Sequence, residues 1–235
     1  MGLLIDIGVA KTNKYASRES GDTVEVIERP AGGLTIVMAD GQGSGRAAKT
    51  LSQMAASRAV AAIKDGARDE AAAITVNDHL LAYRHGQVSS SLILLSFDLR
   101  SNEATAARFG DGSLIVLDAG DEPQVMVECP PAGRYPGAEP VIRRWPLAPK
   151  WLAVACTDGV SNAGSRDACQ IDLLSFIRSL RIDEPAQIGA DRLLQHALSL
   201  AHGKPGDDMS IALARVSEWD GDSAVRRMSV RVETP

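Results

Sequence analysis

Runs of predicted strands alternate with pairs of predicted helices along this chain, and that order restricts its fold more than any other feature. Strand-like segments come first, a helical pair follows, and the stretch from about residue 90 to 128 is all strand. A further strand, a second helical pair and a last strand complete the order. Elements segregated in this way are typical of α+β folds with antiparallel sheets. We therefore expect an α+β fold and one domain over residues 1–235.

Hydrophobic periodicity places the individual elements. Residues 22–28 (DTVEVIE) alternate apolar and polar side chains, as a half-buried strand does. Apolar residues recur at helical spacing from Arg46 to about Lys64, and a second helix is predicted over about 69–84. The other expected elements are a strand at 3–9, an apolar strand that stops at Asp40, an antiparallel meander between 90 and 128, the strand WLAVACTDG, helices at about 168–181 and 184–202, and the strand MSIALARV.

The segment from 129 to 150 is expected to be a loop or flap and not a regular element. The reason is its six prolines: Pro130, Pro131, Pro136, Pro140, Pro146 and Pro149. This flap and the helical pair at 46–84 are candidates for substrate contact and for switching. The tail from Glu218 onward holds Trp219 and a further expected strand, MSVRV.

Charge and cysteine content exclude some classes of function. The net charge of -5 argues against a nucleic-acid partner, since phosphate backbones attract basic proteins. The three cysteines are odd in number and form no CxxC pair, which disfavours a disulfide framework or a zinc site. The N-terminus lacks the basic start of a signal peptide, and no apolar stretch approaches the roughly 20 residues of a membrane span. We expect a cytoplasmic protein with no membrane partner.

Aspartates stand at the ends of several apolar strands. Segments 37–41 (VMADG) and 154–159 (VACTDG) both end in Asp-Gly, Asp207-Asp208 precedes the last strand, and Asp22 opens the strand at 22–28. Each Asp-Gly alone is explained more readily as a turn. If these strand ends meet, however, their carboxylates cannot all stay ionised without cations. Oxygen ligands of this kind favour Mg²⁺ or Mn²⁺.

A glycine-rich segment, residues 41–46 (GQGSGR), leads into the first predicted helix. It does not match a dinucleotide-binding fingerprint, because Arg46 stands where the third glycine is needed, and it lacks the Gly-Lys-Ser/Thr of a phosphate-binding loop. Three interpretations stay open. The Gly41 carbonyl oxygen binds a metal, the helix start favours an anion, or the segment is a plain strand-to-helix turn.

Three segments, taken in order, carry a family resemblance. VMADGQGSGRAAKTLS, LAVACTDGVSNAG and GKPGDDMSIALARV resemble three motifs of the type-2C (PP2C) protein serine/threonine phosphatases, and most closely the bacterial SpoIIE-like branch with the regulators RsbU and RsbX. The resemblance runs from about residue 7 to 216. It implies an α-β-β-α sandwich of two antiparallel sheets flanked by helices. The core would span about 3–216, with a C-terminal extension at 217–235.

The resemblance also implies a metal site. Asp40 would bridge two Mn²⁺ or Mg²⁺ ions and take part in catalysis, and the Gly41 carbonyl would bind one of them. Asp158 and Asp207 would hold the other ion, with Asp208 as a neighbour. Asp22 would fill the place of an upstream acidic ligand.

Two further assignments stay open between alternatives. Arg18 lies four residues before Asp22, the spacing of the family's phosphate-binding arginine. Lys11 and Lys14 are rivals, and a solvated surface charge is an equally good interpretation of Arg18. Asp111, within residues 109–113 (FGDGS), resembles a ligand for a third metal ion in the wider family, whereas a simple hairpin turn is the alternative.

The chain departs from many family members after the first Asp-Gly. Gln42 stands where they carry a histidine proposed to protonate the leaving group, and a glutamine amide cannot act as that acid. The four histidines lie in or near predicted helices, away from the motifs. We expect them to be surface or hydrogen-bonded residues.

The expected function is hydrolysis of phosphoserine or phosphothreonine by a metal-activated water, without a covalent intermediate. The resemblance implies a small regulatory phosphoprotein as substrate, such as an anti-anti-sigma factor or a STAS-domain protein of a stress response. Two alternatives remain. One is a catalytically weak PP2C-like module that binds a partner, and the other is a metal-dependent hydrolase of small phosphoesters.

Overall fold

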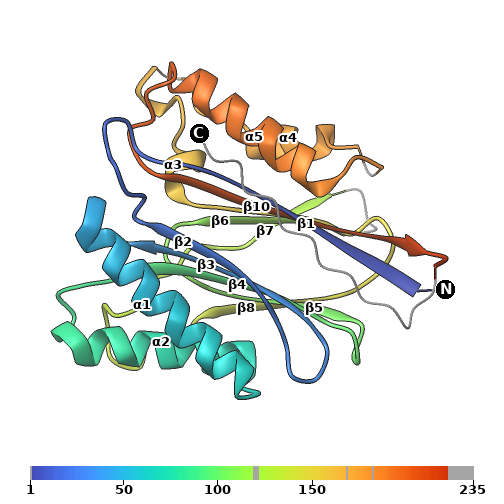
Figure 1. Cartoon of the computed structure of the whole chain (residues 1–235), viewed down its shortest axis with the longest axis horizontal. Coiled ribbons are helices and arrows are strands. Elements are labelled where there is room, and N and C mark those ends of the chain that lie inside the picture. The colour runs from blue at the N-terminus through green and yellow to red at the C-terminus, as the bar shows by residue number, and fades with distance from the viewer. Residues whose placement is uncertain (1, 119–121, 168, 182, 222–235) are drawn as a thin grey trace.

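Two antiparallel sheets stacked face to face form the centre of the protein, and helices cover both outer faces (Figure 1). The computed structural model describes residues 2–118, 122–167, 169–181 and 183–221. Helices α1 (Gly45–Lys64) and α2 (Asp69–Arg84) cover one face. The other face carries α4 (Leu173–Ser179) and α5 (Ala186–Leu200). The expected α-β-β-α sandwich of the α+β class is confirmed.

Within the described residues, each sheet has five strands, and every pairing is antiparallel. In sheet order, the first contains β1 (Gly2–Thr12), β10 (Met209–Trp219), β9 (Leu152–Cys156), β6 (Ser113–Leu117) and β7 (Pro123–Val125). The second contains β2 (Asp22–Glu28), β3 (Gly33–Gly41), β4 (Ser90–Asp98), β5 (Glu103–Phe109) and β8 (Val141–Pro146). Two short helical turns, α3 (Asp158–Ser161) and a 3₁₀ turn (Ser165–Asp167), follow β9.

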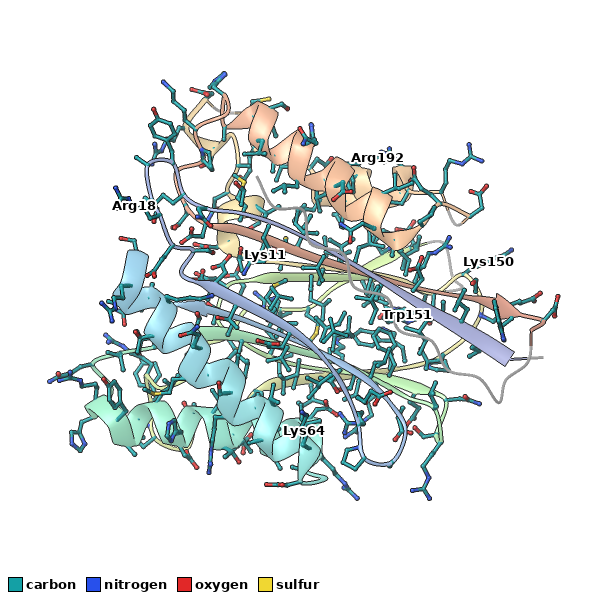
Figure 2. The ribbon with its side chains drawn as sticks, in the orientation of Figure 1. Lys11, Arg18, Lys64, Lys150, Trp151 and Arg192 are labelled. Atoms are coloured by element: carbon teal, nitrogen blue, oxygen red, sulfur yellow. The ribbon has the colours of Figure 1, made fainter. Side chains whose placement is uncertain are left out.

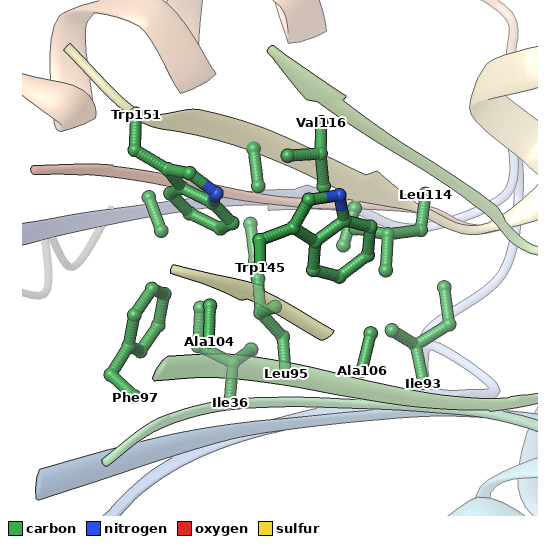
Figure 3. Close-up of a cluster of buried hydrophobic side chains, with 14 of the residues drawn as sticks. Ile36, Ile93, Leu95, Phe97, Ala104, Ala106, Leu114, Val116, Trp145 and Trp151 are labelled. Atoms are coloured by element: carbon green, nitrogen blue, oxygen red, sulfur yellow. The ribbon is translucent and has the colours of Figure 1, made fainter. Parts of the chain in front are cut away.

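The layer between the sheets is the central core. Trp151 is fully buried and meets the Phe97 ring edge to face, with ring centroids 5.6 Å apart (Figure 3). Trp145 lies beside Trp151 at 6.3 Å, and small residues such as Ala104 and Ala106 make room for both indoles. Aromatic pairs of this geometry contribute about 0.5–1.5 kcal/mol beyond the burial of their area. This packing fixes how one sheet lies on the other.

Small residues bring the helices close to the sheets. The face of α1 that meets the second sheet is rich in alanine, including Ala48, Ala55 and Ala59. On the other side, α5 passes so close to β1 that a methyl group added at Gly8 would lie 2.3 Å from the Gln187 backbone nitrogen. Gly8 is therefore required by close backbone approach and not by an unusual φ angle.

A buried ion pair attaches the start of α2 to the second sheet. Arg29 Nη1 lies 3.1 Å from Asp69 Oδ1 and also donates to the hydroxyls of Thr35 and Ser96. Ser96 in turn donates to Asp69. Breaking a buried pair of this kind by removing one partner leaves an uncompensated charge, so α2 is firmly held at this end.

Two expectations about the middle of the chain are wrong. The flap predicted at 129–150 contains strand β8, which pairs with β5. Pro146 is tolerated at its end because β8 is the outermost strand, where a missing N–H breaks no internal ladder. The predicted single meander is in fact two hairpins, since β4 and β5 belong to one sheet and β6 and β7 to the other.

The other predicted elements agree with the structure, although several boundaries move. Strand β2 begins and ends as expected, β4 begins where the predicted all-strand stretch does, and β1 and β10 are longer than predicted. Helices α4 and α5 are shorter than the ranges 168–181 and 184–202. The strand expected at MSVRV lies outside the described residues. Within those residues, every helix is too short or too polar to serve as a transmembrane segment.

The contact at Gly8 gives a stability prediction. Gly8→Ala should lower the free energy of unfolding by about 3 kcal/mol, because its methyl group overlaps backbone atoms of α5 that cannot turn away. Gly2→Ala, in the same strand, meets its neighbours only at 3.5 Å and should change stability by less than about 0.5 kcal/mol. Urea unfolding followed by circular dichroism measures both. Equal stability of the two variants would contradict the packing of α5 on β1.

Candidate metal-binding site

Acidic residues from four separate segments line one cavity of about 240 Å³ at an end of the sandwich. Asp40 is the penultimate residue of β3, Asp158 opens α3 directly after β9, and Asp207 stands before β10. Asp111 comes from the crossing between β5 and β6. The Gly41 backbone lines the same cavity. The strand ends singled out in the sequence therefore do converge in space.

Close packing, and not turn geometry, explains why glycine follows Asp40 and Asp158. A methyl group at Gly41 would lie 2.0 Å from the Ala48 carbonyl oxygen of α1. One at Gly159 would lie 2.1 Å from the Asp208 carbonyl oxygen. Neither glycine has a positive φ angle. Both Asp-Gly pairs thus allow neighbouring backbone to approach the acidic residue, and the turn interpretation does not describe them.

Asp111 occupies the point where the chain crosses from one sheet to the other. Gly110 has a φ of +87°, a conformation that favours glycine, and a side chain there would collide with Ser91. The hairpin turn offered as the alternative for Asp111 is therefore not what the structure has. The crossing turns the residue toward the cavity, where Asp111 Oδ1 accepts a hydrogen bond of 2.6 Å from the Ser91 hydroxyl.

Burial and the crowding of negative charge raise the pKa of the central carboxyls. Burial, and then the charges of Asp22, Asp158 and Asp207, raise the pKa of Asp40 to about 9. Burial, followed by the charges of Asp111 and Asp207, raises the pKa of Asp158 to about 6. The Asp158 carboxyl raises the pKa of Asp40, and the Asp40 carboxyl lowers the pKa of Asp158. Without a cation, this pair therefore holds a proton at neutral pH.

The oxygen atoms present suit a hard divalent cation. Asp158 Oδ1 is buried and accepts no hydrogen bond from any described residue. Carboxylate and carbonyl oxygens are the ligands that Mg²⁺ and Mn²⁺ prefer. Among the described residues, no three acidic, histidine or cysteine side chains already stand at the mutual spacing of a formed metal site. The carboxylates thus surround a cavity that a cation fits, and its binding requires them to draw closer.

Asp22 lies behind this cavity and does not line it. Its side chain is fully buried, and its Oδ2 accepts a hydrogen bond of 3.0 Å from the Thr157 hydroxyl. Burial raises the pKa of Asp22, and its Oδ1 has no hydrogen-bond partner among the described residues. Asp22 pairs directly with Asp40 across β2 and β3. The structure therefore places it next to a cavity residue but one step further from solvent.

The cationic candidates are spread around this end of the protein. Arg18 is exposed on the loop between β1 and β2 and is not among the cavity-lining residues (Figure 2). Lys11, near the end of β1, is also exposed along part of its side chain, but its ammonium donates to the Asp22 carbonyl oxygen at 3.0 Å. Lys49 donates to the same oxygen at 2.7 Å. Burial and the nearby Lys49 charge lower the pKa of Lys11.

Several residues that line the cavity were not predicted from the sequence. Three consecutive serines at the start of β4 line it, and each bonds a different part of the wall. Ser89 donates to Gln42 Oε1, Ser90 to the Asp40 carbonyl oxygen and Ser91 to Asp111. The only signal was the polar triplet in front of an apolar strand, which is also an ordinary strand start.

Part of the proline-rich segment forms another wall of the cavity. Cys129 and Pro131 line it. Isolated bridges from Gly110 to Cys129 and from Ser90 to Ala132 hold this wall against the acidic residues. These contacts could not be predicted from the sequence, because they join residues that lie far apart in the chain.

A larger hollow of about 630 Å³ lies on the outer face of α4 and α5. Phe176 and Ile188 line it, and the Arg192 guanidinium stands over the Phe176 ring. Two aspartates, Asp172 and Asp191, line it, against four in the smaller cavity. We therefore place the chemistry in the smaller acidic cavity.

The raised pKa values predict how the stability of the metal-free protein depends on pH. Asp40 and Asp158 bind protons in the folded state that they release on unfolding, where aspartate has a pKa of about 3.9. These bound protons stabilise the folded state fully at pH values below that pKa. The stabilisation is lost as pH rises through about 6 for Asp158 and about 9 for Asp40. Asp40→Asn should therefore raise the free energy of unfolding at pH 8 by about 2 kcal/mol.

Urea unfolding with a chelator, at pH 5.5 and pH 8, measures this effect. Glu103→Gln, which removes one exposed charge at the far end of β5, serves as the control and should leave the pH dependence unchanged. If Asp40→Asn were less stable than the unaltered protein at pH 8, the shared proton would be excluded.

Comparison with known proteins agrees with this fold. The family model of the stage II sporulation protein E (SpoIIE) matches residues 30–217. The stage II sporulation protein E of Priestia megaterium is 22% identical over 214 residues, which cover 91% of this chain and 36% of that protein. The chain thus spans little more than a third of that relative's length.

Solved structures show the same fold at low identity. The PP2C phosphatase domain of SpoIIE from Bacillus subtilis, with a fragment of its regulatory domain, aligns with a TM-score of 0.79 and 20% identity over 92% of this chain and 64% of that one. RsbX in complex with magnesium aligns with a TM-score of 0.71 and 16% identity, over 91% of this chain and 96% of that one. The catalytic domain of the phosphatase PstP with two manganese ions aligns with a TM-score of 0.71 and 17% identity, over 92% of this chain and 100% of that one. Together with the family match over most of its length, these likenesses show that the chain belongs to the SpoIIE family and has the PP2C phosphatase fold.

Proposed function

We propose that this chain is a metal-dependent protein serine/threonine phosphatase that works with Mn²⁺ or Mg²⁺. The observation that carries the proposal is the convergence of Asp40, Asp111, Asp158 and Asp207 on one cavity. When bound there, two divalent cations supply an activated water and neutralise charge on the phosphoryl group. Relatives of this fold have been solved with magnesium and with manganese, which supports the choice of ions.

The residues of the chain have distinct parts in this proposal. Asp40, which lines the cavity beside Asp158, would hold both ions. The Gly41 carbonyl would hold one ion, and Asp158 and Asp207 would hold the other. Asp111, fixed by Ser91, stands at the rim as a ligand for a third ion. Asp22 supports Asp40 from behind, and only a rearrangement would bring it into direct coordination.

A cation from the β1–β2 end should receive the substrate phosphate. Arg18 keeps this assignment from its spacing, and its exposed side chain must swing toward the cavity to fulfil it. Lys11 and Lys14 are the alternatives. Lys11 has its ammonium near the acidic residues already, on the Asp22 carbonyl oxygen.

No described histidine lines the cavity to protonate the leaving oxygen. Gln42 faces the cavity and accepts a hydrogen bond from Ser89, but its amide has no acidic proton to give. Water therefore supplies the proton in this proposal. The missing acid and the exposed Arg18 favour one second candidate, a catalytically weak module that binds a partner through the same fold.

A regulatory phosphoprotein is the proposed substrate. Solved structures of similar fold include RsbX, a SpoIIE phosphatase domain and a protein from work on the bacterial stressosome. These likenesses support a stress-response or sigma-factor pathway, with an anti-anti-sigma or STAS-domain protein as the phosphorylated partner. A cytoplasmic location stays a prediction.

The first test is hydrolysis with purified protein. With Mn²⁺ added, the unaltered chain should hydrolyse para-nitrophenyl phosphate and a phosphoserine peptide. Asp40→Asn should lower kcat by about a hundredfold or more, because the central ligand loses its charge. Glu103→Gln serves as the control and should retain full activity. Full activity of Asp40→Asn would refute the phosphatase assignment, whereas partner binding without hydrolysis by the unaltered chain would favour the weak module.

The hydrogen bond from Ser91 gives a second prediction. Ser91→Ala should weaken Mn²⁺ binding or activation by about tenfold, because Asp111 loses the group that orients it. Ser91→Thr keeps the hydroxyl and should behave like the unaltered protein. Titration of activity and of binding heat against Mn²⁺ measures both variants. If Ala and Thr had the same effect, the role of the hydroxyl would be excluded.

A further inference from the structure

Two loops meet beside the acidic cavity and are fastened to it by Asp208. One loop joins β1 to β2, and the other joins α5 to β10 (Figure 1). Asp208 is only 4% exposed, and its carboxylate accepts hydrogen bonds from the backbone N–H groups of Lys14 at 2.8 Å and Gly21 at 2.7 Å. The Tyr15 N–H donates to the Pro205 carbonyl oxygen at 2.9 Å. Asp207, the neighbour of Asp208 in the chain, lines the cavity. The hydrogen bonds of Asp208 therefore hold both loops beside the cavity.

The outer surface of these loops and of the 3₁₀ turn (Ser165–Asp167) carries four cationic side chains. We call it the basic lip and define it as Lys14, Tyr15, Arg18, Arg166 and Lys204. The Lys204 ammonium stands 5.4 Å from the centre of the Tyr15 ring, which is 58% exposed. The Arg166 guanidinium packs against Gly206, where an added methyl group would lie 3.1 Å from its Nη2.

The cations of the basic lip are not neutralised by ion pairs. Lys14, Arg18, Arg166 and Lys204 form none with any described carboxylate. Some arginines elsewhere do, as in Arg29 with Asp69 and Arg192 with Glu184. Four acids lie nearby: Glu19 is on the same loop, Asp167 is bonded to His202, and Asp207 and Asp208 lie on the cavity side of the lip, where the Asp208 carboxylate accepts from backbone N–H groups. Unpaired cations fixed on a hydrogen-bonded loop are available to an anionic ligand.

The position of these charges indicates what kind of ligand they receive. The chain carries a net charge of -5, and its cavity is lined by four aspartates, so the protein as a whole repels a phosphorylated and acidic partner. Local cations beside the cavity offset this repulsion where the substrate must approach. Successive residues of an extended substrate segment are about 3.3 Å apart, so residues flanking a phosphoserine in the cavity pass over its rim.

We propose that the basic lip binds acidic side chains that flank the phosphorylated residue of a protein substrate. Lys204 and Arg166 pair with carboxylates of that segment, and the Tyr15 ring packs against its backbone or an apolar side chain. The proposal rests on the proposed phosphatase function, and it makes the sequence around the phosphoserine a determinant of specificity. Charge pairs at an interface rim act mainly on association and depend on salt.

The experiment compares a charge-reversed lip with a matched control. The lip variant is Arg166→Glu with Lys204→Glu, two exposed residues that take no part in the catalytic proposal. The control variant is Arg100→Glu with Lys150→Glu, which makes the same change of charge at the far end of the sandwich, where Lys150 is labelled in Figure 2. The substrates are phosphoserine peptides flanked by glutamates or by glutamines, and para-nitrophenyl phosphate, all with Mn²⁺.

For the glutamate-flanked peptide, we expect the lip variant to lose about tenfold in kcat/KM, or about 1.4 kcal/mol. Added salt should reduce this loss. The glutamine-flanked peptide and para-nitrophenyl phosphate should be hydrolysed as before, and the control variant should behave like the unaltered chain. Equal losses on both peptides, or equal losses in the two variants, would overturn the proposal.

A binding measurement separates this proposal from the phosphatase assignment. Fluorescence anisotropy of the labelled glutamate-flanked phosphopeptide, with a chelator present to stop turnover, should show about tenfold weaker binding to the lip variant. If the unaltered chain hydrolysed nothing and yet bound this peptide through the lip, the phosphatase function would fail and the lip would stand. If the peptide bound both variants equally, the lip proposal would fail whatever the activity.

Discussion

The packing of the two sheets on each other is the interaction on which the rest of the structure depends. Asp40 extends from one sheet, whereas Asp158 and Asp207 adjoin strands of the other. Their distances are therefore set by the layer between them, where Trp151 meets Phe97. A close-packed interior of large aromatic and small alanine side chains resists sliding. The acidic cavity has a defined shape because this core does.

The cavity brings together groups that repel each other, and the fold bears the cost. Burial and mutual charge keep a proton on the Asp40–Asp158 pair at neutral pH, which is a less stable arrangement than dispersed surface carboxylates. Cations that bind only the folded state would raise its free energy of unfolding by mass action and so offset this loss. Conformational stability and catalytic competence are thus coupled at the same atoms, as is common at functional sites.

The sequence predicted those features that depend on local pattern. Asp40, Asp158 and Asp207 were found because each adjoins an apolar strand, and the sandwich followed from the family resemblance. Asp111 was left between two interpretations, since a crossing between sheets and a hairpin turn share the same residues. Whether a strand pairs with one sheet or the other is decided by contacts distant in the chain.

The features that could not be predicted from the sequence also depend on contacts between distant segments. Strand β8 was hidden by prolines that an edge strand tolerates, and its partner β5 is more than thirty residues away in the chain. The hydrogen bond from Ser91 to Asp111 and those from the β1–β2 loop to Asp208 join segments that no periodicity relates. Arg18 matched a family spacing, but a spacing does not fix the direction of an exposed side chain.

The register of the outer strand pair has a practical consequence. Gly2 lies opposite Trp219 and Thr12 opposite Met209, so the acidic cavity is near the second pair and the first pair is at the far end (Figure 1). A fluorescent reporter, an affinity tag or a surface tether joined near Gly2 would leave the approach to the cavity open. Immobilised protein held there would present its acidic end to solution, an orientation suited to measuring encounters with large partners.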